Sequence, residues 1–252
     1  MKLSMSFTDE EVDRYARHLV LREIGGAGQQ ALKRASVLVV GAGGLGAPAA
    51  LYLAAAGVGR IGLVDPDTVA LSNLQRQVIY TEADIGHLKA EAAAARLAGL
   101  NAQLTIEPLP FALTAANAPE VMDGYDLILD GTDDFAVRLI VSDACVAAGK
   151  TLVSGALGRW SGQIGVFAGR PCYRCFLGEA PPQAETCSEV GVVGALAGVI
   201  GSMMALEAIK LITGAGEPLS GRLLIYDSLA AQMRTVRVTP DEACPACGGA
   251  KT

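Results

Sequence analysis

The sequence has little charge. Only 18% of its 252 residues are Asp, Glu, Lys or Arg, whereas 51% are hydrophobic. Disordered chains have the opposite balance, so the composition predicts a folded protein with a large core. The formal net charge of −6 and the isoelectric point of about 5.0 leave no excess of basic residues. This balance argues against a nucleic-acid backbone as the main partner, because phosphate contacts need a basic surface.

The sequence also has no low-complexity tract, no internal repeat and no apolar segment of signal-peptide type in residues 1–18. We therefore expect a cytoplasmic protein. One long apolar stretch without charge, residues 190–206, is at the short limit for a membrane span. Four glycines inside this stretch, and Glu207 and Lys210 just after it, favour a buried, closely packed helix instead.

Apolar runs alternate with helical stretches through the first 155 residues. We expect strands at 36–40, 60–65, 104–109, 126–130 and 151–155, and helices at 8–22, 45–57, 88–99 and 134–148. Thr8 and Glu11 form a capping-box pattern at the start of the first helix. Strands that alternate with helices predict an α/β fold with a doubly wound, mostly parallel sheet of the Rossmann type.

The pattern changes after residue 155, where helices become fewer. We expect strands at 162–168, 222–229 and 233–238, which extend the sheet in part antiparallel, and a long helix at 191–213. The chain is expected to form one domain, 1–252. Its expected parts are an N-terminal helical segment at 1–34, a nucleotide-binding core at 35–155, and a C-terminal part at 156–252 with the last strands and a crossover loop.

A glycine-rich turn lies between the first expected parallel strand and the next helix. Gly41, Gly43 and Gly46 fit G-x-G-x-x-G in the strand–turn–helix context that makes this motif credible. The glycines let the backbone approach phosphate, and the helix N-terminus supplies N–H donors. Asp65, at the end of the next strand, can accept hydrogen bonds from ribose hydroxyls. A tight turn without a ligand is the alternative, but the combined features favour nucleotide binding.

Three charged residues distinguish this site from a nicotinamide site. Arg76, Lys89 and Asp133 follow expected strands, and the carboxyl ends of parallel strands form the usual ligand edge. Arg offers a planar fork to phosphate oxygens and Lys a point charge. A carboxylate suits Mg²⁺, which takes few protein ligands plus phosphate oxygens. Each residue alone is more often a solvated Arg, a surface Lys or a helix-capping Asp; together they predict an ATP–Mg²⁺ site.

Four of the six cysteines form two C-x-x-C pairs, Cys172 with Cys175 and Cys244 with Cys247. This spacing places two thiolates on one metal, and four thiolates without an open position indicate structural zinc. The long separation of the pairs implies that the site fastens the C-terminal tail to the body of the fold. The alternative, two redox motifs, requires a separate reactive setting for each pair.

The other two cysteines have different surroundings. Cys145 lies in an apolar helical run and is expected in the core. Cys187 precedes the glycine-rich helix, whose N-terminus can lower a thiol pKa and make the thiolate a nucleophile. An unreactive loop cysteine is the alternative at position 187.

The segments GAGGLG, LVDPDTVALSNLQRQ, DGTDD, PCYRC and CPAC together resemble the ThiF/MoeB/HesA family, bacterial relatives of ubiquitin-activating E1 enzymes. The resemblance covers nearly the whole chain, and SNLQRQ is specific to the group. It implies an adenylyltransferase that uses ATP and Mg²⁺ to adenylate the C-terminal glycine of a small ubiquitin-like sulfur carrier, releasing pyrophosphate. The implied carrier is MoaD-like in molybdopterin synthesis or ThiS-like in thiamine synthesis.

The resemblance also implies roles for individual residues. Nucleotide contacts fall on Gly41, Gly43, Gly44, Gly46, Asp65, Ser72, Asn73, Leu74, Gln75, Arg76, Lys89, Asp133 and Asp134. Arg76 and Lys89 stabilise phosphate charge, and Asp133 holds Mg²⁺. Arg17 matches an arginine that reaches the ATP of the other subunit in a homodimer. Cys187 matches a position that bonds covalently to the carrier in some members. Asp134 departs from the family, which commonly has Asn there.

Two other functions are weighed against this one. A nicotinamide-dependent oxidoreductase has no need of Arg76 or Lys89, and no hydride-transfer acid is evident. A non-catalytic module that only docks the carrier would not need the four charged residues expected at the ATP site. All four are present: Arg17, Arg76, Lys89 and Asp133. No rhodanese-like domain follows the expected zinc site, so we expect a separate protein to donate the sulfur.

Overall fold

The computed structural model describes residues 7–178 and 191–249, and the strands in these residues form one eight-stranded sheet. The strands are β1 (Ser36–Val40), β2 (Arg60–Val64), β3 (Thr105–Leu109), β4 (Leu127–Asp130), β5 (Thr151–Leu157), β6 (Ser161–Phe167), β7 (Arg222–Asp227) and β8 (Gln232–Arg237). All eight lie within two residues of the bounds expected from the sequence. The expected Rossmann-like α/β fold is confirmed.

The sheet order is β3-β2-β1-β4-β5-β6-β7-β8. The first five strands of the chain, β1 to β5, pair in parallel, and β6, β7 and β8 continue the sheet antiparallel. The chain winds outward from β1 in one direction and then returns to place β4 on its other side. Ligands of such sheets bind outside the carboxyl ends of the strands where the winding reverses, here between β1 and β4.

Helices precede and connect these strands. Within the described residues they are α1 (Asp9–Leu19), α2 (Gly25–Arg34), α3 (Gly46–Ala56), α4 (Lys89–Leu100), α5 (Ala118–Asp123), α6 (Phe135–Ala148), α7 (Tyr173–Leu177) and α9 (Gly194–Thr213), with 3₁₀ turns η1 (Leu71–Asn73) and η2 (Glu82–Asp84). The helix α2 falls inside the helical segment expected at 1–34. The sequence does not predict α5 and α7, which are too short for a clear helical period.

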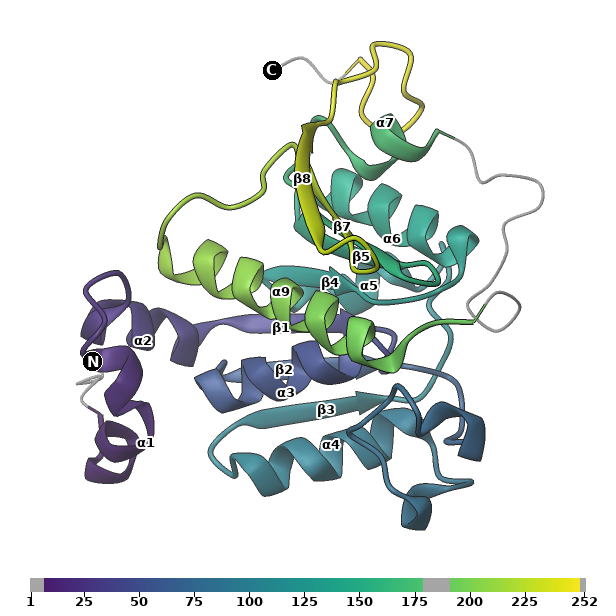
Figure 1. Cartoon of the computed structure of the whole chain (residues 1–252). Coiled ribbons are helices and arrows are strands. Elements are labelled where there is room, and N and C mark those ends of the chain that lie inside the picture. The colour runs from purple at the N-terminus through teal and green to yellow at the C-terminus, as the bar shows by residue number, and fades with distance from the viewer. Residues whose placement is uncertain (1–6, 179–190, 250–252) are drawn as a thin grey trace.

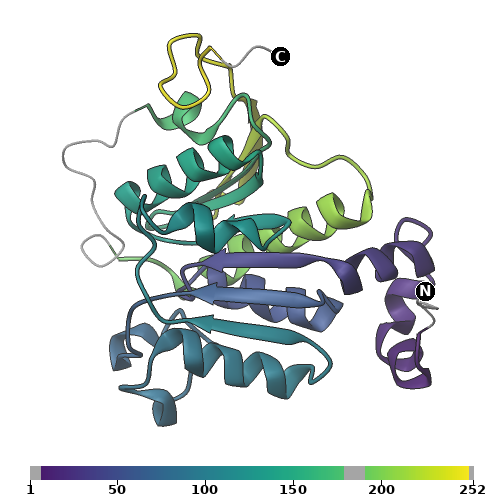
Figure 2. The ribbon, with the colours of Figure 1, turned by 180° about the vertical axis from the view of Figure 1, so that it is seen from behind.

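Two helical layers cover the sheet (Figures 1 and 2). Side chains of α2, α3, α4 and α9 form one apolar core with one face of the sheet, and those of α5, α6 and α7 form a second core with the other face. Strands buried from both sides read as continuous apolar runs, which explains why β1, β2 and β4 are evident in the sequence.

The helix α9 is the one described helix long and apolar enough to cross a membrane, and 44% of its apolar window is buried against the rest of the fold. It lies against α2, α3, β5 and β6. A Cβ atom on Gly201 would approach Pro48 Cγ to 2.4 Å and the Leu45 carbonyl oxygen to 2.5 Å, so glycine permits the close approach of α3. The expected close packing is confirmed, but the helix is buried on one side only, and Leu206 on its other side is 59% exposed.

The N-terminal helix α1 is anchored at the amino-terminal edge of the sheet. Thr8 and Glu11 form the expected capping box. Asn101 Nδ2 donates to the Tyr15 hydroxyl at 2.9 Å, which ties α1 to the end of α4. Both whole-chain views place α1 and α2 at the end of the molecule away from the tips of the strand arrows (Figures 1 and 2).

Candidate active site

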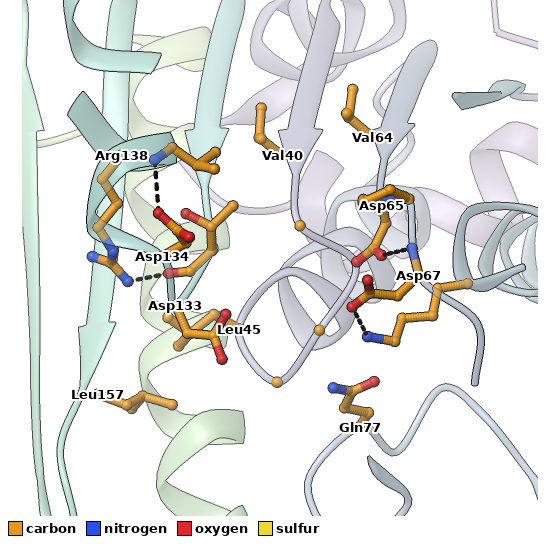
Figure 3. A pocket seen from close by; sticks show the side chains of 18 of the residues that line it. Val40, Leu45, Val64, Asp65, Asp67, Gln77, Asp133, Asp134, Arg138 and Leu157 are labelled. Atoms are coloured by element: carbon orange, nitrogen blue, oxygen red, sulfur yellow. Dashed lines mark hydrogen bonds and ion pairs between the residues drawn. The ribbon is translucent and has the colours of Figure 1, made fainter. Parts of the chain in front are cut away.

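A pocket of about 450 Å³ opens at the carboxyl ends of β1, β2 and β4, where the order of the strands reverses (Figure 3). Most residues that the sequence assigns to a nucleotide line it: Gly41, Gly43, Gly44, Asp65, Asn73, Arg76, Lys89, Asp133 and Asp134. These residues come from five separate segments, so the fold, and not sequence proximity, brings them together.

The glycine loop forms one wall of the pocket and leads into α3. Gly46 itself does not line the pocket. A Cβ atom at this position would lie 1.8 Å from the carbonyl oxygen of Gly41, so glycine is required for α3 to pack on the end of β1. The N-terminus of α3 therefore follows the loop directly, and its positive dipole end favours an anion there.

Asp65 connects β2 to this loop. Its side chain is buried, and it accepts hydrogen bonds from Ala42 N at 2.8 Å and Asp67 N at 2.9 Å. Burial raises the pKa of Asp65, and the nearby Lys89 ammonium and the two amides oppose that rise. Each carboxylate oxygen keeps a second lone pair, so the group is oriented and can still accept a hydroxyl.

The segment after β2 supplies further polar side chains to the pocket, next to the glycine loop. Asn73 Oδ1 accepts from Ala70 N at 3.1 Å, which leaves its Nδ2 donor available. Arg76 Nη1 donates to the Ser72 carbonyl at 3.1 Å. Gln77, which the sequence analysis did not single out, is buried, lines the pocket and has an Oε1 atom without a hydrogen-bond partner in the described structure.

Three residues of the same segment lie outside the lining of the pocket. Ser72 contributes its carbonyl to Arg76 and is otherwise exposed. Leu74 packs against the apolar core, and Gln75 Nε2 donates to the Val192 carbonyl at 3.2 Å. Leu74 therefore attaches the segment to the core, and Gln75 attaches it to the residues just before α9.

Lys89, the first residue of α4, points into the pocket from a buried stem. Its Nζ atom lies 2.8 Å from Asp67 Oδ2, and the exposed fractions of the two side chains are 7% and 65%. Figure 3 shows Asp67 beside Asp65, on the same side of the pocket as Gln77. Asp67 is a second pocket residue that sequence reasoning missed, although it stands two positions after Asp65 in the same segment.

The loop between β4 and α6 carries two acidic side chains with different tasks. Asp134 caps α6, because its Oδ1 atom accepts from Ala136 N at 2.7 Å and Val137 N at 3.0 Å. An Asn side chain can cap a helix in the same way. The carboxylate of Asp133 is exposed and forms no hydrogen bond or ion pair with the residues that the structure describes. Its oxygens are therefore available to a cation in the pocket.

A buried network holds this loop from beneath. Asp130 accepts from Thr132 N and Oγ1 at 3.1 and 2.7 Å and from Ser154 Oγ at 2.9 Å. Arg138 Nη2 donates to the Thr132 carbonyl, and Arg138 is buried beside the Asp130 charge, which raises its pKa against the effect of burial. The sequence signal for Arg138 is a single basic residue in an otherwise apolar helical run.

Two further predicted residues, Arg17 and Cys187, are not placed in this pocket. Arg17 is exposed on α1, at the opposite end of the sheet from the carboxyl ends of the strands (Figures 1 and 2). Cys187 lies outside the described residues, so its predicted role is not addressed by the geometry. Cys145 is buried in the core as expected, and burial raises the pKa of its thiol to about 12.

The four paired cysteines meet in one cluster between α7 and the C-terminal segment. All four Sγ atoms lie within 4.8 Å of one another, with separations of 4.0 Å for Cys172–Cys175, 3.6 Å for Cys172–Cys244 and 3.3 Å for Cys175–Cys247. Zn–S bonds of about 2.3 Å in a tetrahedron require sulfur separations of about 3.8 Å. The cluster therefore has the donor set and the dimensions of a four-thiolate metal site.

The ThiF family model matches residues 15–246. A sulfur carrier protein adenylyltransferase of Thermus thermophilus is 48% identical over 98% of this chain and 95% of its own length. An adenylyltransferase and sulfurtransferase of Arabidopsis thaliana, MOCS3, is 45% identical over 98% of this chain and 54% of its own length. The chain thus spans nearly all of the first relative and about half of the second.

Solved structures share the fold. Crystal structures of Escherichia coli MccB superimpose with TM-scores of 0.84 for the protein alone and 0.79 for the complex with ATP. They cover 98% and 97% of this chain and 75% and 83% of the MccB chains, at 22% and 20% identity. The family match begins within α1 and ends at residue 246, so it includes the whole pocket and three of the four clustered cysteines. The chain therefore belongs to the ThiF family, as its motifs indicate.

Proposed function

We propose that this chain catalyses the ATP-dependent adenylation of the C-terminal glycine of a ubiquitin-like sulfur carrier, MoaD-like or ThiS-like, and releases pyrophosphate. The observation that carries the proposal is the pocket, which combines the glycine loop with Arg76, Lys89 and Asp133 at one edge of the sheet. The adenylyltransferase activity named for the Thermus thermophilus relative supports the same reaction.

The reaction requires alignment and charge stabilisation. A carboxylate oxygen of the carrier forms a bond to the α-phosphorus of ATP, and the bond from that phosphorus to the bridging oxygen breaks as pyrophosphate departs with the electron pair. Both reactants are anionic, so the site must hold them in line and neutralise the leaving group. Lys89 and Arg76 supply positive charge, and the amides at the start of α3 supply oriented dipoles.

No proton transfer is required for this step, because a C-terminal carboxylate is ionised at neutral pH. His18 has a structural partner instead: its Nδ1 atom lies 2.9 Å from Gln29 Oε1. Neither His18 nor His87 lines the pocket. The geometry thus supports a mechanism that depends on electrostatics and positioning, and it assigns the histidines no part.

Magnesium fits the carboxylate that has no partner among the described residues. Asp133 would hold the ion, while Asp134 stays on the N-terminus of α6 and Asp130 stays in the network beneath the loop. When bound, Mg²⁺ supplies positive charge to phosphate oxygens. The replacement of the usual Asn by Asp134 adds a negative charge beside Asp133, while Asp134 Oδ1 still caps α6.

A homodimer accounts for the position of Arg17. The side chain is exposed on a helix at the edge of the sheet away from its own pocket. An arginine placed there acts on a nucleotide only if that nucleotide belongs to another subunit. We therefore assign Arg17 to the active site of the second subunit, where its guanidinium adds a third positive charge beside the phosphates.

The Cys172, Cys175, Cys244 and Cys247 cluster is proposed to hold structural zinc, since four thiolates leave no position for water or substrate. A cytoplasmic location suits both ATP consumption and reduced thiols. After adenylation, a separate protein donates sulfur to the carrier. Cys187 is proposed as the residue that can bond to the carrier at that stage.

The test is incubation of the protein with ATP, Mg²⁺ and either a MoaD-like or a ThiS-like carrier that ends in Gly-Gly. Pyrophosphate release and the intact mass of the carrier are measured. The proposal expects release with one carrier and a carrier mass increased by one adenylate. No pyrophosphate release with either carrier would contradict the proposal. If a nicotinamide cofactor supplied instead of ATP were reduced, that result would support the oxidoreductase alternative.

A further inference from the structure

Lys89 and Asp67 form a cation–carboxylate pair inside the pocket. The Nζ–Oδ2 distance is 2.8 Å, and both residues line the cavity. Lys89 is 7% exposed, whereas Asp67 is 65% exposed. The cation is therefore fixed within the protein, and its carboxylate partner stands on the solvent side.

Only the side chain of Asp67 is free to move. Its backbone N–H donates to Asp65 Oδ1 at 2.9 Å, and its carbonyl oxygen accepts from the Lys89 N–H at 2.8 Å. Rotation about its side-chain bonds carries the carboxylate into solvent and leaves these two backbone bonds unchanged. Lys89, in contrast, is held at the start of α4 by its buried stem.

The other two cations that line the pocket, Arg76 and Arg138, form no ion pair with the described residues. Arg76 donates to the carbonyl of Ser72, and no carboxylate of the described residues lies within ion-pair distance of its guanidinium. The charge of Arg76 is therefore fully available to a phosphate, while that of Lys89 is shared with Asp67. Because Lys89 is the one of these three cations with an ion-pair partner in the described structure, any competition is localised to Lys89.

We infer that Asp67 is an internal competitor for phosphate, whose carboxylate and a phosphate oxygen exchange on the ammonium of Lys89. The inference rests on the proposed function. A carboxylate and a phosphate offer the same anionic oxygens to a lysine. When pyrophosphate leaves, Asp67 returns to a buried ammonium that would otherwise have no anionic hydrogen-bond partner, which is costly. Asp67 thus weakens phosphate binding and promotes release of the product.

The test compares pyrophosphate and ATP binding to the full chain by calorimetry. Asp67→Asn removes the charge with little change of shape. We expect pyrophosphate to bind on the order of tenfold tighter, because it no longer has to displace about one charge-assisted hydrogen bond from Lys89. Asp67→Glu keeps the charge and should bind nearly as the parent chain does. Asp84→Asn is the matched control, because Asp84 pairs with Arg96 outside the pocket and should leave binding unchanged.

A kinetic readout separates competition from a structural role. Pyrophosphate should inhibit carrier-dependent turnover of Asp67→Asn at a correspondingly lower concentration, while its unfolding temperature stays near that of the parent chain. Asp67→Ser removes the same charge through a different side chain and must shift affinity in the same direction.

Unchanged or weaker pyrophosphate binding by Asp67→Asn and Asp67→Ser would overturn the inference, since Asp67 would then only orient Lys89. Failure of the parent chain to bind either ATP or pyrophosphate would instead contradict the proposed function. The two failures are therefore distinguishable.

Discussion

The centre of the sheet and its C-terminal edge are stabilised in different ways. All four residues of β4 are buried, whereas all six residues of β8 are exposed. The segment after β8 returns to the body of the protein at Cys244 and Cys247, which meet Cys172 and Cys175 near α7. Apolar packing on both faces thus holds the strands that carry the nucleotide pocket, and thiolates hold the C-terminal tail. Chemistry and tail attachment should therefore fail separately.

The largest expected effect is on catalysis within the parallel part. Arg76→Ala should lower ATP–pyrophosphate exchange by about 10²–10³-fold, because one charge opposite the leaving group is lost. Folding should be retained, since Arg76 makes only one hydrogen bond to a carbonyl in the described structure. Arg96→Ala, an exposed arginine outside the pocket, is the control and should exchange normally. Near-normal exchange by folded Arg76→Ala would remove this residue from the site.

Gly46→Ala should damage the parallel part itself. The added Cβ atom overlaps the Gly41 carbonyl oxygen at 1.8 Å, so α3 must shift away from the end of β1. Overpacking of this kind costs about 1–3 kcal/mol or more of unfolding free energy. Thermal unfolding measures the loss, with Gly99→Ala as control because nothing lies within 4 Å of a Cβ atom there. Equal stability of the two variants would contradict the packing described for the glycine loop.

A smaller, partial effect is expected from mixed subunits. Chains with Arg17→Ala and chains with Asp133→Ala should each be inactive alone, because each lacks one charged group of every site. After mixing and reassociation, random pairing should restore about a quarter of the parental activity, since half the dimers then contain one complete site. Activity assays on mixed and unmixed samples provide the measurement. Absence of recovery in verified mixed dimers would place Arg17 within its own subunit or outside catalysis.

The smallest effect on chemistry is expected from the tail. Cys244→Ser should lose bound zinc and lower the unfolding temperature, because metal binding is coupled to folding. Amide exchange should increase mainly after residue 240, while the affinity for ATP changes by less than about twofold. Metal analysis and calorimetry test both statements. A variant that retains full stability but loses adenylation would place the metal in the reaction.

The sequence predicts the central parallel strands well because they are buried on both faces. Strands β1, β2 and β4 are continuous apolar runs, and alternating helices separate them, so the parallel core is evident without tertiary information. The helices α5 and α7 span six and five residues, and packing in the second apolar core stabilises them. Such short elements have no helical period to detect.

The site is predicted less completely. Gly41, Asp65, Arg76 and Lys89 belong to recognisable motifs, and the structure brings them to one pocket. Asp67 acquires its importance only from Lys89, which is distant in sequence and close in space. Arg138 likewise depends on its contact with the Thr132 carbonyl. Pairwise contacts of this kind depend on the folded geometry, and motifs and periodicity in one sequence do not show which distant residues meet.

Carrier-dependent ATP–pyrophosphate exchange tests the central claim most directly. The parent chain, ATP and Mg²⁺ are incubated with labelled pyrophosphate and a Gly-Gly-ended sulfur carrier, and incorporation of label into ATP is followed. We predict exchange that requires the carrier and its terminal glycine, since reversible formation of the acyl-adenylate is the only route for the label. Exchange without a carrier, or no exchange with MoaD-like and ThiS-like carriers alike, would contradict adenylation at the carboxyl edge of this sheet.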